Sequence, residues 1–187
     1  MPKVISFTLD KNSIHKAIRE LESAFEESLD MEKYINGLLE EAYTYATEHL
    51  LDLSLYASTD MTKVVNKLEI RKYDPVTKSG GLILHGGEGE ENVGFFVEFG
   101  TGVVGLSHQH PESYKAGWGY DDGGHGEKGW WYPSTEQDLN PYKWTDSEGQ
   151  LRAWTKGMPS RPFMYDTMLW LKQQTGEQNV NINFVVN

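Results

Sequence analysis

The segment Phe96-Val97-Glu98-Phe99-Gly100-Thr101-Gly102 divides the sequence, because an apolar run ends there in a pair of closely spaced glycines. Side chains alternate across a strand, so a strand over residues 93–99 would turn Phe95, Val97 and Phe99 toward one face. Glycine adopts positive φ without strain, so Gly100 and Gly102 allow an immediate turn. The segment therefore predicts a central, largely buried strand that ends in a tight turn.

Two amphipathic helices are predicted before this strand. A short strand over residues 3–9 comes first, and apolar residues then recur every three or four positions over 14–25. Asp30 is a suitable cap for a second helix that reaches about residue 57. Residues 64–73 and 81–85 are β-type runs separated by the turn-forming residues 74–80, so they predict two more antiparallel strands.

The sequence after Gly102 predicts a long insertion followed by a helix. Residues 103–157 are rich in Gly, Trp, Tyr and His, too aromatic for disorder, with short strands expected at 129–132 and 151–155. Ser160 and Pro162 can begin a helix that ends at Gly176. Residues 180–185 alternate like a strand and are a natural partner for residues 3–9.

This order of elements predicts an α+β fold. We expect an antiparallel sheet on which two N-terminal amphipathic helices and one C-terminal helix pack, with the aromatic, glycine-rich insertion added. The chain has 187 residues, the size of one ordinary globular domain, so residues 1–187 are expected to form a single domain.

Composition limits the classes of function. The net charge of −11 argues against a surface that tracks phosphates, because nucleic-acid binding relies on Lys and Arg. The chain has no cysteine, which removes disulfides, thiolate metal sites and cysteine nucleophiles. No membrane span or signal peptide is recognised, so we expect a protein made in a cytoplasm. Acidic residues crowd the first helices, either as a solvated face or as a lining that repels passing DNA.

Two short motifs resemble a known family. The segment Phe96 to Gly102, followed after the insertion by Met158-Pro159-Ser160-Arg161-Pro162-Phe163-Met164, is similar to the signature of the tail-completion or neck proteins of tailed bacteriophages. The stretch Gly126-Glu127-Lys128-Gly129-Trp130-Trp131-Tyr132 also resembles the insertion of members from phages of Gram-positive bacteria.

This resemblance implies a structural virion protein with no catalytic residue, cofactor or metal. It implies a ring, of six copies by the symmetry of the tail, at the head-tail junction between tail tube and capsid connector. The partners would be further copies and neighbouring neck or tail-tube proteins, with DNA only passing through and no membrane. The motif residues are Glu98, Phe99, Gly100, Thr101, Gly102, Arg161, Pro162 and Phe163. The expected assembly contacts in the insertion are Trp118, Trp130, Trp131, Tyr132, Trp144 and Trp154.

Arg161 is expected to need an anionic partner, because the start of a helix is unfavourable for a cation. Glu98 is the candidate, and its pairing with Arg161 would lock the last helix to the preceding strand. The alternative is that both side chains are simply exposed.

Two other functions stay open. The tryptophans of the insertion could form a carbohydrate-binding platform, although packing also explains them. A metal-dependent hydrolase would use the imidazoles and carboxylates of one loop region, although such residues also occur together by chance in surface loops. These residues are His108, His110, Asp121, Asp122 and His125. A phosphate-binding glycine loop and a Ser-His-Asp triad are both disfavoured, since their surrounding patterns are missing.

Overall fold

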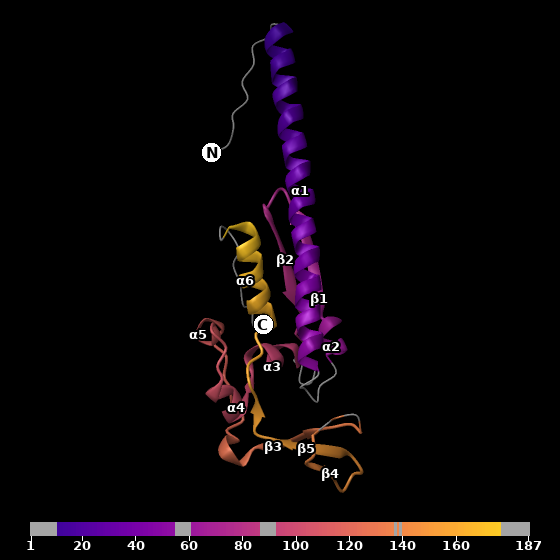
Figure 1. Cartoon of the computed structure of the whole chain (residues 1–187), viewed down its shortest axis with the longest axis vertical. Helices are drawn as coiled ribbons and strands as arrows, with labels where there is room; N and C mark the ends of the chain where they lie inside the picture. Colours follow the sequence, from indigo (N-terminus) through magenta and orange to yellow (C-terminus); the bar gives the residue numbers. More distant parts are fainter. Residues whose placement is uncertain (1–10, 55–60, 87–92, 137, 139, 177–187) are drawn as a thin grey trace. The chain divides into compact units, whose positions relative to one another are not determined.

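The computed structural model describes residues 11–54, 61–86, 93–136, 138 and 140–176 (Figure 1). The chain forms two compact units, Met1–Glu40 with Ile70–Gly81, and Glu41–Glu69 with Leu82–Asn187. The α+β class with antiparallel strands is confirmed, but the strands are distributed over two sheets. The strands predicted at 3–9 and 180–185 lie outside the described residues, and the single domain stays a prediction.

The predicted pair of N-terminal helices is one helix, α1, over Lys11–Ser54. The expected break at Asp30 is wrong because residues 28–30 contain neither Gly nor Pro. Ser and Asp in a helix interior cost only up to about 0.7 kcal/mol each relative to Ala, which the continuing backbone hydrogen bonds override. Lys33 stands where a capping box would need Glu, so no side chain there favours a new start.

A two-stranded sheet of β1 (Leu68–Asp74) and β2 (Ser79–Leu84) carries the predicted turn over residues 75–78. Asp74 accepts the N–H of Val76 and the hydroxyl of Thr77, and these hydrogen bonds lower the pKa of its carboxyl. The N–H of Tyr73 donates to Asn36 Oδ1 of α1 at 2.8 Å. Residues at the start of the strand predicted over 64–73 form instead the short helix α2, Thr62–Val65.

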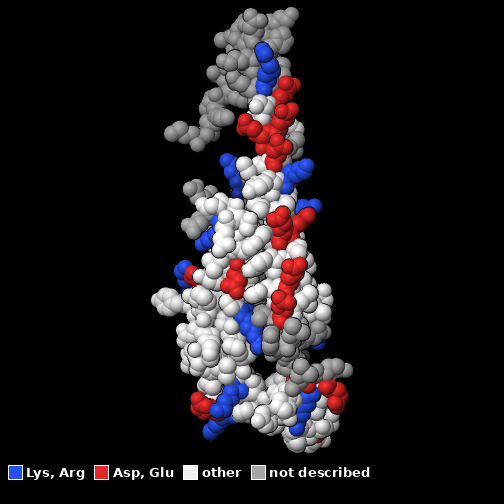
Figure 2. All heavy atoms as spheres, in the orientation of Figure 1, with Lys and Arg blue, Asp and Glu red and all other residues white. Residues whose placement is uncertain are grey.

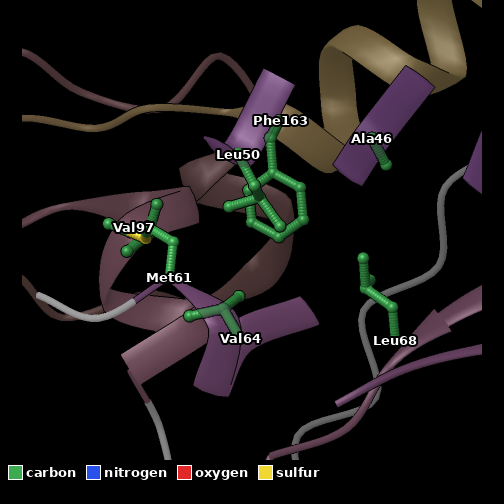
Figure 3. Packing of buried hydrophobic residues seen from close by; sticks show 7 residues of the cluster. All are labelled: Ala46, Leu50, Met61, Val64, Leu68, Val97 and Phe163. Carbon is green, nitrogen blue, oxygen red and sulfur yellow. The ribbon is translucent and has the colours of Figure 1, made fainter. Parts of the chain in front are cut away.

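The core of the larger unit lies where α1, α2, β1, α3 and α6 meet (Figure 3). Its members are apolar side chains with at most 8% of their surface exposed, and burial of each of those larger than alanine stabilises the fold by about 1.5–3 kcal/mol. They are Ala46, Leu50, Met61, Val64, Leu68, Val97 and Phe163. Trp170 of α6 also stacks on Tyr45 of α1, with ring centroids 5.3 Å apart.

The segment predicted to be the central strand is a helix, α3 (Val93–Phe99). Gly94, Val97 and Glu98 are buried in it, a spacing of three and four residues that fits one helix face and not an alternating strand. A short apolar run does not distinguish the two by pattern alone. The next helices are α4 (Gly102–Ser107) and α5 (Ser113–Ala116).

The last helix, α6, runs over Phe163–Thr175 and ends at Gly176, whose φ of 70° is left-handed as the predicted stop requires. The expected cap on Ser160 is wrong, because the helix begins after Pro162, which makes no capping hydrogen bond through its side chain. Phe163, Thr167 and Met168 are the buried residues of this helix. No helix within the described ranges has the length and apolarity needed to cross a membrane.

A three-stranded antiparallel sheet stands within the insertion, in the order β3-β5-β4. It consists of β3 (Trp130–Pro133), β4 (Lys143–Thr145) and β5 (Leu151–Thr155), and the short strand β6 (Gly157–Met158) follows. The strands predicted at 129–132 and 151–155 are therefore confirmed. Sequence reasoning missed β4, a strand of only three residues.

Candidate functional site

The two family-like motifs meet in one place, here named the motif junction: Glu98 to Gly102 against Gly157 to Phe163. Thr101 pairs with Met158 and Gly102 with Gly157 in an antiparallel bridge. The N–H of Arg161 donates to the carbonyl of Val97 at 2.8 Å, and the Ser160 hydroxyl donates to the carbonyl of Glu98 at 2.6 Å. Segments about 60 residues apart are thus joined through main-chain groups.

The glycine turn is required by its surroundings. Gly100 and Gly102 have φ of 80° and 61°, as the sequence predicts. A Cβ on Gly100 would lie 2.6 Å from Ser160 N, and one on Gly102 would overlap the carbonyl oxygen of Lys156. Both positions therefore need glycine for two reasons, the left-handed backbone and the close approach of the second motif.

Glu98 is buried and caps the start of α6. Its Oε2 accepts the N–H of Met164 at 2.9 Å, and its Oε1 accepts the N–H of Tyr165 at 3.0 Å. These are the second and third residues of the helix, the amides that a local N-cap side chain normally serves. A carboxylate also suits the positive end of the helix dipole.

The predicted ion pair between Glu98 and the Arg161 side chain is therefore wrong. The carboxylate meets the helix amides and His110, while Arg161 joins the preceding helix through its backbone N–H. Glu98 nevertheless holds α6 to the segment before the glycine turn, as that hypothesis intended. Burial lowers the pKa of the Arg161 guanidinium from its ordinary value.

His110 completes the hydrogen bonding of Glu98. Its Nε2 lies 2.9 Å from Glu98 Oε1, and its Nδ1 accepts the N–H of Glu112 at 2.9 Å. Because Nδ1 is an acceptor, the ring proton is assigned to Nε2, which donates to the carboxylate. Both side chains are 2% exposed or less, so this pair is shielded from water.

Aromatic rings cover the junction. Trp118 stacks on Phe99 with centroids 4.9 Å apart, and its indole N–H donates to the carbonyl of Gly100 at 3.0 Å. The His110 ring lies 4.5 Å from Phe99. Trp118, predicted as an assembly contact, is therefore partly buried and bonded within its own chain.

The remaining predicted contacts divide between the two sides of the three-stranded sheet. Trp130 and Tyr132 face the side that buries Ala153, and the Tyr132 hydroxyl donates to Asp138 at 2.7 Å. Burial raises the pKa of Asp138, but hydrogen bonds from Asn140, Tyr132 and Ser134 outweigh it and leave the pKa below its ordinary value. This side supports the insertion internally.

The opposite side is an open aromatic surface, here named the aromatic face. Cross-strand pairs share a face, and Trp131 pairs with Trp154 while Trp144 pairs with Arg152. Trp131 and Trp144 are 48% and 56% exposed, and their rings meet edge to face at 6.1 Å. The exposed Tyr142 contacts Trp154 at the same distance. The face therefore consists of Trp131, Tyr142, Trp144, Arg152 and Trp154.

The histidines and aspartates considered as metal ligands do not converge. His110 pairs with Glu98, His125 pairs with Asp121 at 3.0 Å, and His108 Nδ1 lies 3.2 Å from the carbonyl of Val104. Asp121 also accepts the N–H groups of Gly126 and His125, and these bonds lower the pKa of its carboxyl. The described residues hold no group of three His, Cys, Asp or Glu side chains arranged for a metal ion.

Sequence reasoning missed Tyr142, Arg152 and Asp138. It considered His110 only as a possible metal ligand and not as the partner of Glu98. Side chains alternate along a strand, so strands over 142–144 and 151–155 would have placed Tyr142 on the side of Trp144 and Arg152 on the side of Trp154. The Glu98–His110 contact leaves no local signal, because its members are 12 residues apart, one in α3 and the other in the loop between α4 and α5.

A scan against protein-family models, a search of curated proteins and a search of solved structures each found no match for this chain.

Proposed function

We propose that this chain is a structural, non-enzymatic component of a tailed bacteriophage, which assembles into a ring at the head-tail junction. In this role it connects the tail tube to the capsid connector. It contacts neighbouring neck or tail-tube proteins and further copies of itself, six in all by the symmetry of the tail.

The observation that carries the proposal is the motif junction. The two segments on which the family resemblance rests are about 60 residues apart, yet they bond to each other through main-chain groups and through Glu98. A resemblance by chance would have no reason to select two segments that build one scaffold element. The junction leaves the insertion between them available for contacts with other chains.

The aromatic face is the proposed assembly contact. Trp, Tyr and Arg are the residues most enriched at the energetic centres of protein interfaces, and this face combines all three. Trp131 and Trp144 replace the wider set of six expected contacts, because they are exposed while Trp118 is bonded to its own chain. Contiguous exposed apolar groups of this kind mark interaction sites more often than scattered exposed residues do.

The acidic part of α1 fits a protein past which DNA moves without binding. Glu22, Glu26, Glu27 and Asp30 are exposed on this helix, and Figure 2 shows carboxylates gathered along it. Fixed negative charge repels the phosphate backbone. The genome is therefore proposed as a passing molecule and not as a ligand.

Two observations test this proposal: which genes flank this one, and whether the protein is present in purified virions. The proposal expects flanking genes for portal, capsid and tail-tube proteins, and expects this chain in purified particles at a fixed copy number by quantitative mass spectrometry. A carbohydrate-utilisation or toxin locus, or absence from the particles, would overturn it.

A carbohydrate-binding module is the second candidate, and the half-exposed pair Trp131 and Trp144 favours it. Exposed aromatic rings stack on the apolar faces of sugars, so a glycan on this face would quench tryptophan fluorescence. Titration with cell-wall glycans tests this, with Trp131→Ser as the variant that removes the response and Tyr114→Ser as the control. No change in fluorescence across the glycans would exclude the second candidate.

A further inference from the structure

The N-terminal part of α1 exposes apolar side chains on one side. Leu21 and Phe25 are 56% and 65% exposed, and Met31 is about half exposed. Successive residues of a helix are about 100° apart, so these three side chains lie within a sector of about 120°. We name them the α1 stripe. Aligned exposed apolar side chains of this kind mark an interaction surface.

The charge of α1 decides which partner suits this stripe. Between Arg19 and Tyr34 the sequence has six carboxylates and two cations, a net charge of −4. Pairing with α1 of another copy would bring like charges together, which is unfavourable at an interface. The occupant must therefore be apolar and rich in hydrogen-bond donors or positive charge.

The aromatic face has these properties. Its apolar area comes from Trp131 and Trp144, and within the described residues the indole N–H groups of these two side chains have no acceptor. Arg152 adds a guanidinium whose charge is already paired, because its Nε donates to Asp146 at 3.0 Å and its Nη2 donates to Gln150 at 2.8 Å. The face thus offers apolar area and indole N–H donors where the stripe is flanked by carboxylates.

We propose that the α1 stripe of one copy docks on the aromatic face of a second copy. The two surfaces are different, so the contact is heterologous and repeats head to tail, the kind of contact that builds closed rings. This inference rests on the proposed function, since it names the self-contact of the ring. At 100° per residue, Glu32 lies on the side of the stripe and enters the interface, whereas Glu26 and Asp30 lie on the opposite side of the helix.

The test is complementation between two variants. Leu21→Asp with Phe25→Asp removes the stripe, and Trp131→Ser with Trp144→Ser removes the face. Wild-type protein should associate with increasing concentration in sedimentation velocity, whereas each variant alone should stay monomeric. An equimolar mixture should form a dimer and no larger species, because one intact stripe meets one intact face.

Matched control variants change residues that lie outside the two proposed surfaces. Ser23→Asp adds an aspartate on the opposite side of α1, and Tyr114→Ser removes an exposed aromatic residue outside the face. Both should associate like wild type. Circular dichroism should show unchanged helix content in all variants. Because the chain has no cysteine, a mixture of Phe25→Cys and Trp144→Cys should form a disulfide-linked dimer, and Ser23→Cys should not replace Phe25→Cys.

Several outcomes would overturn the inference. These are a mixture that stays monomeric without crosslinking, a single variant that still assembles fully, or crosslinking that is independent of concentration in a chain carrying both cysteines. Such results leave the proposed function intact if the flanking genes and the virion content agree with it. The wrong genomic setting would remove the proposed function instead, even where the head-to-tail contact forms.

Discussion

The motif junction and the aromatic face both combine aromatic rings with an acidic–basic pair, but water reaches only one of them. At the junction, Glu98 and His110 are buried beside Phe99. On the face, Asp146 and Arg152 lie beside the exposed Trp144. A charged or hydrogen-bonded pair that is shielded from water stabilises the fold. A pair that water reaches contributes little to stability and stays available to a partner.

The largest expected effect comes from removing the buried acceptor. Glu98→Ala leaves the N–H groups of Met164 and Tyr165 and the Nε2–H of His110 without their carboxylate, so unfolding free energy should fall by about 3–5 kcal/mol. Urea denaturation measures this. Glu127→Ala, which removes an exposed partner of Lys156, should cost about 1 kcal/mol or less. Equal losses would contradict the contrast between buried and exposed pairs.

The glycine turn offers a second way to break the junction. Gly102→Ala should lower the free energy of unfolding by about 1–3 kcal/mol or more, because the new Cβ meets both a left-handed backbone and the carbonyl of Lys156. Gly149→Ala is the matched control, since its φ is 79° but no atom lies within 4 Å of the added Cβ. A control loss as large as that of Gly102→Ala would show that close approach contributes nothing.

Acid should loosen the inner side of the three-stranded sheet. The pKa of Asp138 is depressed in the folded chain, so its contribution to stability is complete above about pH 4 and is lost as pH falls through the lower folded value. Tryptophan fluorescence should therefore change below about pH 4. Asp138→Asn should reduce this acid dependence, and an unchanged acid profile in that variant would count against the assignment.

The smallest effect on stability is expected at the aromatic face. Trp131→Ser with Trp144→Ser removes one ring contact between exposed side chains, so the free energy of unfolding should fall by about 1 kcal/mol or less. Thermal and urea denaturation measure this. A loss of several kcal/mol would mean that these rings belong to the core and have a purely structural role.

Local chemistry was readable from the sequence. The positive φ of Gly100 and Gly102, the end of α6 at Gly176 and the strands β3 and β5 all follow from residues near each other in the chain. Each depends on what a single residue type permits or on a short alternating pattern.

Features that depend on contacts between distant segments could not be predicted from the sequence. The apolar run that became α3 fits helix and strand alike, and its helical form depends on burial of Gly94, Val97 and Glu98 by segments far along the chain. The continuity of α1 through Asp30 depends on how little a polar residue costs inside a helix. The partner of Glu98 was misassigned because a helix start is usually capped by its own neighbourhood.

The contact between Glu98 and the amide of Met164 closes a loop of 66 residues, which contains the whole insertion. The entropy of closing a flexible loop grows only with the logarithm of its length, so halving or doubling such a loop changes the closure free energy by about 0.6 kcal/mol. The junction therefore tolerates insertions of very different size at little thermodynamic cost. A chain built this way can exchange its contact surface while the scaffold that carries it stays unchanged.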